Sequence, residues 1–418
     1  MWLPSGRRIL YGKYRNLGGT TDVVLESRDL NGSNPTVLLS NADLRAMSWA
    51  QPGRLLLGIR ESPPRQQDIN LWQIECDRDS GKPTSPLRRL TDWTGFAFAS
   101  IASTSTGKTI VFQNMRQQSD VYIGELAESG ATLRDPQRLT LDLRYDWPTA
   151  WSPDSKSVVF YSDLGGNFDL YRQHVAQHDI EKLTTGSEEK WAPQVTADGK
   201  WIFFMAWPAN SDPGKASAKL MRVAASGGPA EFVADLKGRP SDAFTTVAGF
   251  PSFRCPTLGN ADCVVAEASN GQETVFTAMD GAGARKREII RLAGNPEIVN
   301  WALSPDGSRL AITTFDYNSA NVQIVPVNGG APQKYSVMPW NELVAVAWTS
   351  DGKALFLASN SSRGTALIRY DLGKSSKLLW KTTWDLFQIT PSPDGKYLAL
   401  GPNIYDANAW IISDLPSK

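Results

Sequence analysis

The chain has 418 residues, and its 43 Lys and Arg residues balance 43 Asp and Glu residues, so its formal net charge is zero. A broad basic surface for nucleic acid is therefore not expected, and a hydrophobic content of 41% excludes general disorder. The chain lacks the run of about 18 apolar residues that a transmembrane helix needs, and it offers only two histidines for acid–base or metal chemistry.

A short turn motif recurs from one end of the chain to the other. Its best copies are Ser304-Pro305-Asp306-Gly307 and Ser392-Pro393-Asp394-Gly395, which fit a type I turn with proline second and glycine fourth. Successive copies are 43 to 60 residues apart, close to the length of a four-stranded propeller blade. The glycine position of the motif, once occupied by serine, recurs at Gly6, Gly53, Gly107, Ser155, Gly199, Gly259, Gly307, Gly352 and Gly395.

Each turn is followed by segments that read as strands. An apolar run comes first, at residues 157–161, 201–205, 310–313, 354–358 and 397–400. A second strand follows, at residues 68–76, 120–126, 169–175, 273–279, 321–327, 366–371 and 409–413. A short third strand closes several units, at residues 88–91, 137–140 and 181–184. With the strand that enters the turn, each repeat has four.

No segment shows a sustained helical period, so the sequence predicts an all-β fold. We expect a single β-propeller of four-stranded antiparallel blades over residues 1–418, with eight blades favoured and seven or nine also open. One blade is expected to be completed from both ends of the chain.

The turn, the apolar strand after it and the run at residues 162–171 resemble the WD40-like repeat of TolB-type propellers over nearly the whole chain. Residues 138–140, 145–151 and 408–412 resemble the propellers found C-terminally in large acidobacterial-type Ser/Thr kinases and winged-helix regulators. That resemblance implies a sensory or interaction module of bacterial signalling. The chain departs from those proteins because it contains neither a kinase motif nor a DNA-binding domain.

Motifs with possible chemistry are few. Residues 102–109 approach a phosphate-binding loop but have Ala102 in place of its first glycine. His174 and His178 are four apart, which suits a metal site on a helix, but they fall in a predicted hairpin connection. Cys255 and Cys263 flank a degenerate turn, where either a disulfide or two buried thiols would fit. No cofactor and no metal are expected.

The connections that enter the inner strands combine tryptophan with carboxylates, which describes a binding surface at one mouth of the channel. Those tryptophans could equally wedge between blades. We therefore expect a non-catalytic, monomeric binding module for a protein segment or small ligand, without nucleic acid or membrane insertion. A hydrolase-like or lyase-like channel enzyme and a plain scaffold are the alternatives. The candidate binding residues are Trp93, Asp146, Trp147, Glu188, Trp191, Trp340, Glu342 and Trp384.

The compartment depends on the parent protein. A cytoplasmic location is expected if Met1 is the true start, and an extracytoplasmic one if the chain is the C-terminal part of a membrane-anchored protein.

Overall fold

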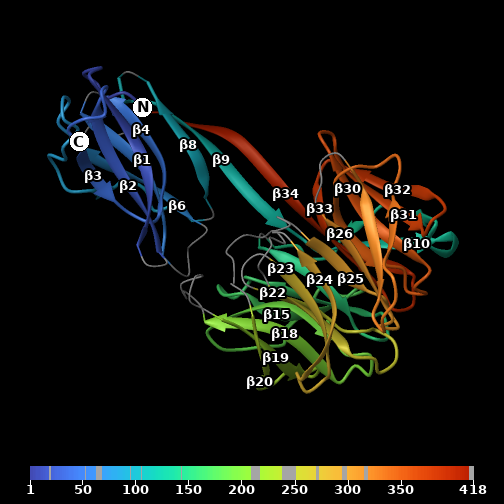
Figure 1. Ribbon diagram of the computed structural model, residues 1–418. Helices are drawn as coiled ribbons and strands as arrows, with labels where there is room; N and C mark the ends of the chain where they lie inside the picture. The colour runs from blue at the N-terminus through green and yellow to red at the C-terminus, as the bar shows by residue number, and fades with distance from the viewer. Residues whose placement is uncertain are drawn as a thin grey trace. The chain divides into compact units, whose positions relative to one another are not determined.

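The computed structural model describes residues 1–17, 20–51, 53–62, 68–94, 96–104, 106–142, 144–208, 217–237, 251–269, 273–293, 299–314 and 319–413. The chain divides into two compact units, the first made of Met1–Gln117 and Tyr405–Lys418 and the second of Gln118–Ile404 (Figure 1). The chain thus passes from one unit to the other twice. Each unit is described by itself.

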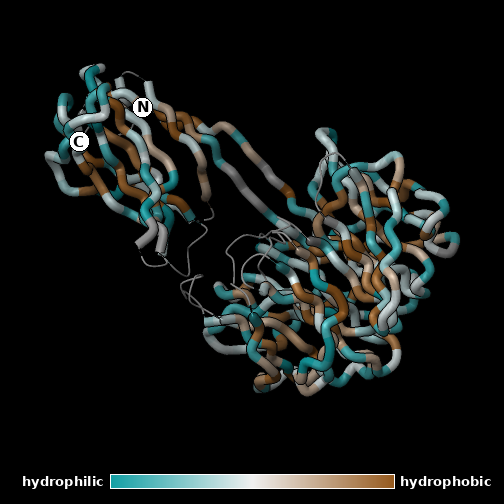
Figure 2. Tube along the Cα trace, viewed as in Figure 1, coloured by the Kyte–Doolittle hydropathy of each residue, from teal (hydrophilic) through white to brown (hydrophobic). Residues whose placement is uncertain are grey.

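Nearly all regular structure in the described residues is β-strand, and the one helix among them is a 3₁₀ turn at Glu128–Gly130. In the part of the chain that the structure describes, no helix is long and apolar enough to cross a membrane. Hydrophobic segments run through the strands, and hydrophilic segments mark many of the turns between them (Figure 2). The predicted all-β class is confirmed.

The first unit is built from three packed groups of strands. The first sheet contains β1 (Arg8–Leu17), β2 (Thr20–Asp29) and β3 (Thr36–Ser40). The second contains β4 (Leu44–Gln51), β5 (Arg54–Arg60), β6 (Ile69–Glu75) and β7 (Arg88–Arg89). The third contains β8 (Phe98–Ser103), β9 (Ile110–Ser119) and the end of β34 (Tyr397–Ile412). Buried leucines join the first two sheets, and Phe98 and Phe112 pack against Leu56 and Leu71 to join the second to the third.

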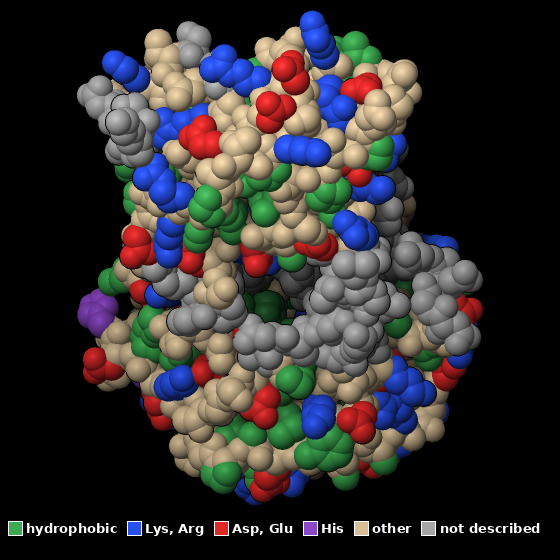
Figure 3. All heavy atoms as spheres, turned by 90° about the vertical axis from the view of Figure 1, so that its left-hand side faces the viewer, with side chains coloured by type: hydrophobic (Ala, Val, Ile, Leu, Met, Phe, Trp, Pro, Cys, Tyr) green, Lys and Arg blue, Asp and Glu red, His purple; other side chains and the backbone are tan. Residues whose placement is uncertain are grey.

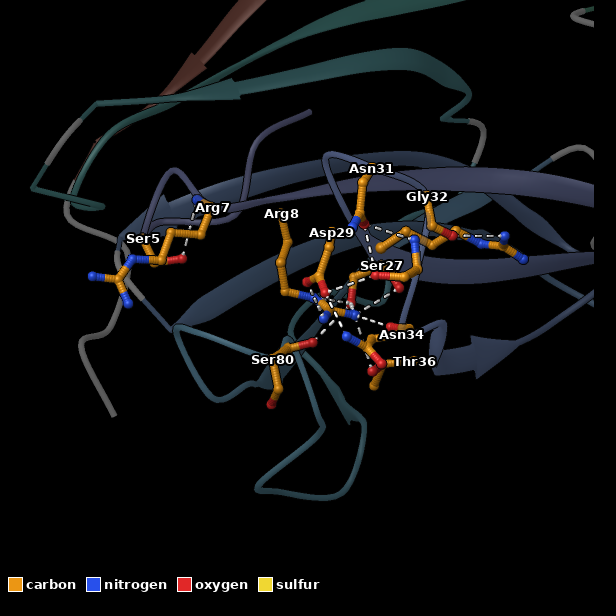
Figure 4. A network of polar contacts seen from close by, with 12 residues as sticks. Ser5, Arg7, Arg8, Ser27, Asp29, Asn31, Gly32, Asn34, Thr36 and Ser80 are labelled. Atoms are coloured by element: carbon orange, nitrogen blue, oxygen red, sulfur yellow. Dashed lines mark hydrogen bonds and ion pairs between the residues drawn. The ribbon is translucent and has the colours of Figure 1, made fainter.

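Arg8 connects the strands of the first sheet from inside (Figure 4). Its guanidinium forms an ion pair with Asp29 at 2.6 Å and donates to the Ser27 carbonyl at 2.9 Å and the Thr36 hydroxyl at 3.1 Å. The Ser27 hydroxyl in turn donates to the carbonyl of Ser80, at 2.7 Å. Because a buried guanidinium is tolerated only when its donors have partners, this network is structural rather than a free binding site.

The described residues of the second unit form six antiparallel sheets. Five of them follow the chain in order: β13 (Asp146–Trp151), β14 (Ser157–Ser162), β15 (Asp169–His174) and β16 (Ile180–Lys182); β17 (Glu188–Val195), β18 (Trp201–Pro208), β19 (Ala218–Ala224) and β20 (Glu231–Leu236); β21 (Ser252–Arg254), β22 (Cys263–Ser269), β23 (Glu273–Met279) and β24 (Arg285–Ala293); β25 (Val299–Leu303), β26 (Arg309–Thr314), β27 (Asn321–Pro326) and β28 (Gln333–Ser336); β29 (Leu343–Trp348), β30 (Ala354–Ser361), β31 (Gly364–Asp371) and β32 (Ser376–Thr382).

The sixth sheet is assembled from two distant parts of the chain. β33 (Asp385–Pro391) and the first part of β34 come from the C-terminal region, and they pair with β10 (Tyr122–Ala127) and β12 (Gln137–Arg138). A short β11 (Thr132–Leu133) also pairs with β10. We expected one sheet to be completed from both ends of the chain, but this sheet combines residues 122–138 with residues 385–400, and both chain ends belong to the first unit.

A hydrophobic cluster lies between each of the six sheets and the next, so the sheets close into a ring. Five clusters each join one sheet to the next. The order is the sixth sheet, then the sheets β29–β32, β25–β28, β21–β24, β17–β20 and β13–β16. In the remaining cluster, Val121 and Ala399 of the sixth sheet pack with Val158 and Phe160 of the sheet that begins with β13. The second unit is therefore a six-bladed β-propeller.

This ring has six sheets, whereas the sequence favoured eight blades along residues 1–418. The difference arises at β34, which runs unbroken from Tyr397 to Ile412, although we expected two separate strands, at residues 397–400 and 409–413. The first half of β34 pairs with β10, and β9 neighbours β34 in the same sheet. The ring closes at that pairing, and the repeats near Gly6 and Gly53 form sheets of the first unit.

The nine predicted turn positions all have backbone φ angles in the left-handed region, between 59° and 91°. The values at Gly307 and Gly395, 73° and 71°, confirm the turn prediction. In the turn of Gly395, the Ser392 hydroxyl donates to Asp394 at 2.7 Å, and the backbone N–H of Lys396 donates to the same carboxylate at 3.0 Å. The copies that begin at residues 152, 196, 304 and 349 repeat these bonds.

Ser155 takes the glycine position in one turn, and the ring closure explains why. It is buried with φ at 59°, a conformation that favours glycine. Its hydroxyl accepts a hydrogen bond at 3.0 Å from the backbone N–H of Asp394, which belongs to the turn of the sixth sheet. The serine therefore links the two sheets that meet where the ring closes.

Replacing Gly395 with Val is expected to destabilise the chain by on the order of 2 kcal/mol, because a side chain at this φ is strained. An added Cβ would also lie 2.4 Å from the Ser350 hydroxyl oxygen. Urea unfolding followed by circular dichroism measures the effect. Gly281→Val is the matched control, since a Cβ there meets nothing within 4 Å. Equal loss of stability in both variants would contradict the assigned turn.

Candidate functional site

A cavity of about 220 Å³ lies at the centre of the ring, and we call it the channel cavity. All six inner strands, β13, β17, β21, β25, β29 and β33, contribute residues to its wall. Pro305, Ser350 and Pro393 also line it, so it extends to the end of the ring where the repeat turns lie. A concave site with a few convergent polar groups is the usual form of a small-molecule site.

Three tryptophans fix the wall of the channel cavity by joining neighbouring inner strands. All three are nearly fully buried and line the cavity. Each indole N–H donates to an adjacent inner strand: Trp151 to the Thr390 carbonyl at 2.8 Å, Trp301 to the Ser252 hydroxyl at 2.9 Å, and Trp348 to the Ala302 carbonyl at 3.2 Å.

Amides and hydroxyls supply most of the polar wall. Gln194 donates to the Thr149 carbonyl at 3.2 Å, and the Thr390 hydroxyl donates to the Pro148 carbonyl at 3.0 Å, so these groups are held in place. Gln388 lines the channel cavity, and its amide makes no hydrogen bond to another described residue. Amides both donate and accept, so the wall can bind hydroxyl, amide or carboxylate groups.

Arg254 is the one charged residue among the described residues that line the channel cavity. Its guanidinium carbon lies 5.5 Å from the centre of the Trp301 ring, and its Nη1 donates to the Phe253 carbonyl at 2.9 Å. Burial lowers the pKa of Arg254 to about 10, so the side chain stays positive at neutral pH. Within the described part of the chain, no carboxylate forms an ion pair with it.

A disulfide joins Cys255 and Cys263 beside this arginine. The bond fixes the end of β21 to the start of β22, on either side of the degenerate turn. The sequence left open either a disulfide or two buried thiols at these positions, and the structure has the disulfide. Cys76, the third cysteine, is buried and free, and burial raises the pKa of its thiol to about 12.

Two of the predicted tryptophans come together in the second unit. Trp147 and Trp191 share an aromatic cluster with Tyr145, Tyr161 and Phe168. Trp147 is 4% exposed and Trp191 is half-buried. The strands that carry them, β13 and β17, reach the channel cavity only with later residues, so neither tryptophan lines it.

The other three predicted tryptophans lie elsewhere. Trp93 belongs to the first unit, where it stacks on Phe112 with 5.3 Å between ring centres. Trp340 donates from its indole to the Ser376 hydroxyl at 3.0 Å, against the outer strand β32. Trp384 packs against Tyr122 of β10, at 5.0 Å between ring centres. The five indoles therefore do not form one ring of contacts.

The three predicted carboxylates also differ in their surroundings. Asp146 is fully buried at the start of β13, Glu188 is exposed, and Glu342 is partly buried. Burial, with a smaller contribution from the Asp142 carboxylate, raises the pKa of Asp146 to about 7. Burial also raises the pKa of Glu342, with a smaller contribution from Asp385. None of the three lines the channel cavity.

The remaining sequence motifs have structural positions. Ala102 lies in β8, and Gly107 occupies a repeat turn at φ 66°. His174 ends β15, and His178 is exposed in the connection to β16. The described residues hold no group of three or more His, Cys, Asp or Glu side chains placed to bind a metal ion.

We did not predict the residues that line the channel cavity, because we looked for a binding site in the loops and these residues occupy inner strands. Gln194, Asn300 and Gln388 each lie a few residues before a repeat turn, so aligning the repeats on their turns would have singled out these polar positions. Arg254 precedes Gly259 by the same distance as Gln194 precedes Gly199, but the turn at Gly259 is degenerate and hides this alignment.

No family model matches the chain. It is 25% identical over 314 residues to the uncharacterized protein Atu1656 of Agrobacterium fabrum, a match that covers 71% of this chain and 94% of that protein. Among solved structures it is similar to TolB from Acinetobacter baumannii, with 14% identity, a TM-score of 0.41, and coverage of 95% of this chain and 80% of TolB. It is also similar to an oligogalacturonate lyase in complex with manganese, with 14% identity, a TM-score of 0.42, and coverage of 72% and 76%. The fold assignment stands on the sheets and their packing.

Proposed function

We propose that the six-bladed ring is a non-catalytic binding module and that its ligand is a small molecule held in the channel cavity. The observation that carries this proposal is the composition of the cavity wall. Among the described residues, six inner strands line one cavity with amides, hydroxyls, aromatic rings and a single cation. The wall is held by hydrogen bonds between neighbouring sheets, which favours a preformed site.

The alternative of a channel enzyme has less support in this wall. The described lining residues include no Asp, Glu, His or Lys, and the cysteine among them is bonded in the disulfide. General acid–base catalysis needs a titratable group within hydrogen-bond reach of the substrate, and nucleophilic catalysis needs an activated nucleophile beside a base. The groups that do line the cavity bind and orient a ligand.

A binding role through a broad charged surface also has less support. The face in Figure 3 shows Lys and Arg side chains interspersed with Asp and Glu. With zero net charge, this pattern favours neither nucleic acid nor another highly charged partner. The aromatic cluster around Trp147 and Trp191 stays our second proposal for a contact site, for a protein segment.

Filling the channel cavity is expected to abolish ligand binding. In Gln388→Trp, an indole replaces a side chain that lines the cavity and makes no hydrogen bond to a described residue. A thermal-shift screen of a small-molecule library against the full chain identifies compounds that raise the melting temperature. We expect those shifts to disappear in the Gln388→Trp variant.

Gln137→Trp is the matched control, because Gln137 is exposed on the outer strand β12. It should keep every shift seen with the original chain. Shifts that survive in Gln388→Trp, or a screen in which no compound stabilises the chain, would contradict binding in the channel cavity.

The biological setting is a wider proposal. The resemblance to the propellers of kinases and winged-helix regulators supports a sensory module, in which occupancy of the ring is read by another domain. The Cys255–Cys263 disulfide supports an extracytoplasmic location, because disulfides persist in oxidising compartments.

A further inference from the structure

Among the described residues, no carboxylate neutralises the positive charge of Arg254. Its described neighbours are the backbone carbonyl of Phe253, the face of Trp301 and the phenol of Tyr161, and all three are uncharged. Arg254 is partly buried, and burying a cation without an anionic partner is costly, so proteins normally pair such a group or solvate it. By comparison, two buried carboxylates of the ring are paired: Asp169 with Lys190 at 2.9 Å and Asp120 with Arg138 at 2.7 Å.

Other arginines of the ring show what a purely structural arrangement looks like. Arg222 lies over Trp201 at 4.3 Å, as Arg254 lies over Trp301, but Arg222 also pairs with Glu231 at 2.7 Å. Arg285 likewise pairs with Glu267. Arg254 repeats the stacking on tryptophan without the carboxylate, and it lines the channel cavity, whereas Arg222 does not.

The groups that share the cavity with Arg254 suit a carboxylate. A guanidinium offers paired N–H donors that match the two oxygens of a carboxylate. Gln388 and Gln194 line the same cavity and supply amide groups for the rest of a small polar molecule. A volume of about 220 Å³ restricts the ligand to a small molecule.

We propose that the ligand of the channel cavity is a small organic acid and that Arg254 binds its carboxylate. This inference rests on the proposed function and adds the chemical class of the ligand. The bound carboxylate would replace the missing ion-pair partner of the guanidinium, while the amides of the wall would bind the hydroxyl or amide groups of the same molecule.

The test compares organic acids with neutral counterparts of the same shape. D-gluconate is paired with D-glucitol and L-glutamate with L-glutamine, and citrate and succinate complete the set. Each compound is titrated into the full chain by calorimetry and thermal shift. The same titrations use Arg254→Gln, Arg254→Lys and the control Arg222→Gln.

We expect at least one acid to bind the original chain and its affinity to fall at least about tenfold in Arg254→Gln, the usual loss for a charged hydrogen bond. Arg254→Lys should recover part of the affinity, because it restores the charge without the paired donors. Arg222→Gln should bind as the original chain does.

Two results would overturn the inference, and they differ from a failure of the proposed function. In the first, the neutral counterparts bind as tightly as the acids, and both bind the Arg254→Gln variant as tightly as the original chain. The cavity would then remain a binding site, but a carboxylate ligand would be excluded. In the second, the original chain binds none of the acids, which would also exclude a carboxylate ligand. If acids bind but keep their affinity in Gln388→Trp, the site lies outside the channel cavity and the proposed function fails.

Discussion

Replacing Trp151 with Ala is expected to lower the free energy of unfolding by about 3–5 kcal/mol, the usual cost of truncating a buried tryptophan. The indole is 4% exposed, stacks on Tyr397 at 6.1 Å between ring centres, and donates to the Thr390 carbonyl at 2.8 Å. Trp151 lies in β13, whereas Thr390 and Tyr397 belong to the sixth sheet. The substitution therefore weakens the contact that closes the ring.

Urea unfolding of the full chain, followed by far-ultraviolet circular dichroism, measures this loss. Trp151→Phe should lose less, because it keeps an aromatic ring and removes only the N–H donor. Trp410→Ala is the control, since Trp410 is 46% exposed and belongs to the first unit. A Trp151→Ala variant as stable as Trp410→Ala would contradict closure of the ring at β13.

The Asp146→Asn variant is expected to gain stability relative to the original chain as pH rises from about 4 to 8. The pKa of Asp146 is about 7 in the folded chain, against 3.8 for an exposed aspartate, because burial penalises its charged form. Between these values the folded state holds a proton that the unfolded state has released. The contribution of Asp146 is thus fully present below pH 3.8 and is lost as pH rises to about 7, a change of at most roughly 4 kcal/mol.

The test is to measure the free energy of unfolding of the Asp146→Asn variant and of the original chain at several pH values, and to follow the difference between the two. Asp198→Asn gives a contrast of opposite sign, because a hydrogen bond from Thr196 lowers the pKa of Asp198. The original chain should exceed Asp198→Asn in stability at neutral pH, and this advantage should fade in acid. A difference between Asp146→Asn and the original chain that stays constant from pH 4 to 8 would show that Asp146 is not buried.

The local parts of the fold could be predicted because short-range chemistry determines them. The serine, proline, aspartate and glycine of each turn bond to one another within five residues, as in Ser392–Lys396, so the motif alone defines the turn. The apolar runs after the turns became the second strands of the sheets for the same reason.

Strand partners over long distances could not be predicted in the same way. Because the repeats are alike, a strand from one repeat can pair either with the next strand of its own repeat or with the equivalent strand of another repeat. β34 pairs with β10, and the paired residues Tyr122 and Leu400 are far apart in the chain. Local sequence does not distinguish this pairing from a hairpin within one repeat. The number of blades depends on that choice.

The candidate site was harder to predict because aromatic and acidic residues also stabilise the sheets. Trp340 and Trp384 pack near outer strands, and the Asp169 carboxylate accepts a hydrogen bond from Thr184 while pairing with Lys190. The polar residues of the channel cavity are single side chains in apolar strands, and they form a group only after the ring closes.

A crystal structure of the chain with the most strongly stabilising organic acid is the most direct test of the binding proposal. We expect the compound to occupy the channel cavity with its carboxylate against the guanidinium of Arg254. A structure in which the channel cavity is empty and the compound lies beside Trp147 and Trp191, or outside the ring, would contradict the proposed binding site.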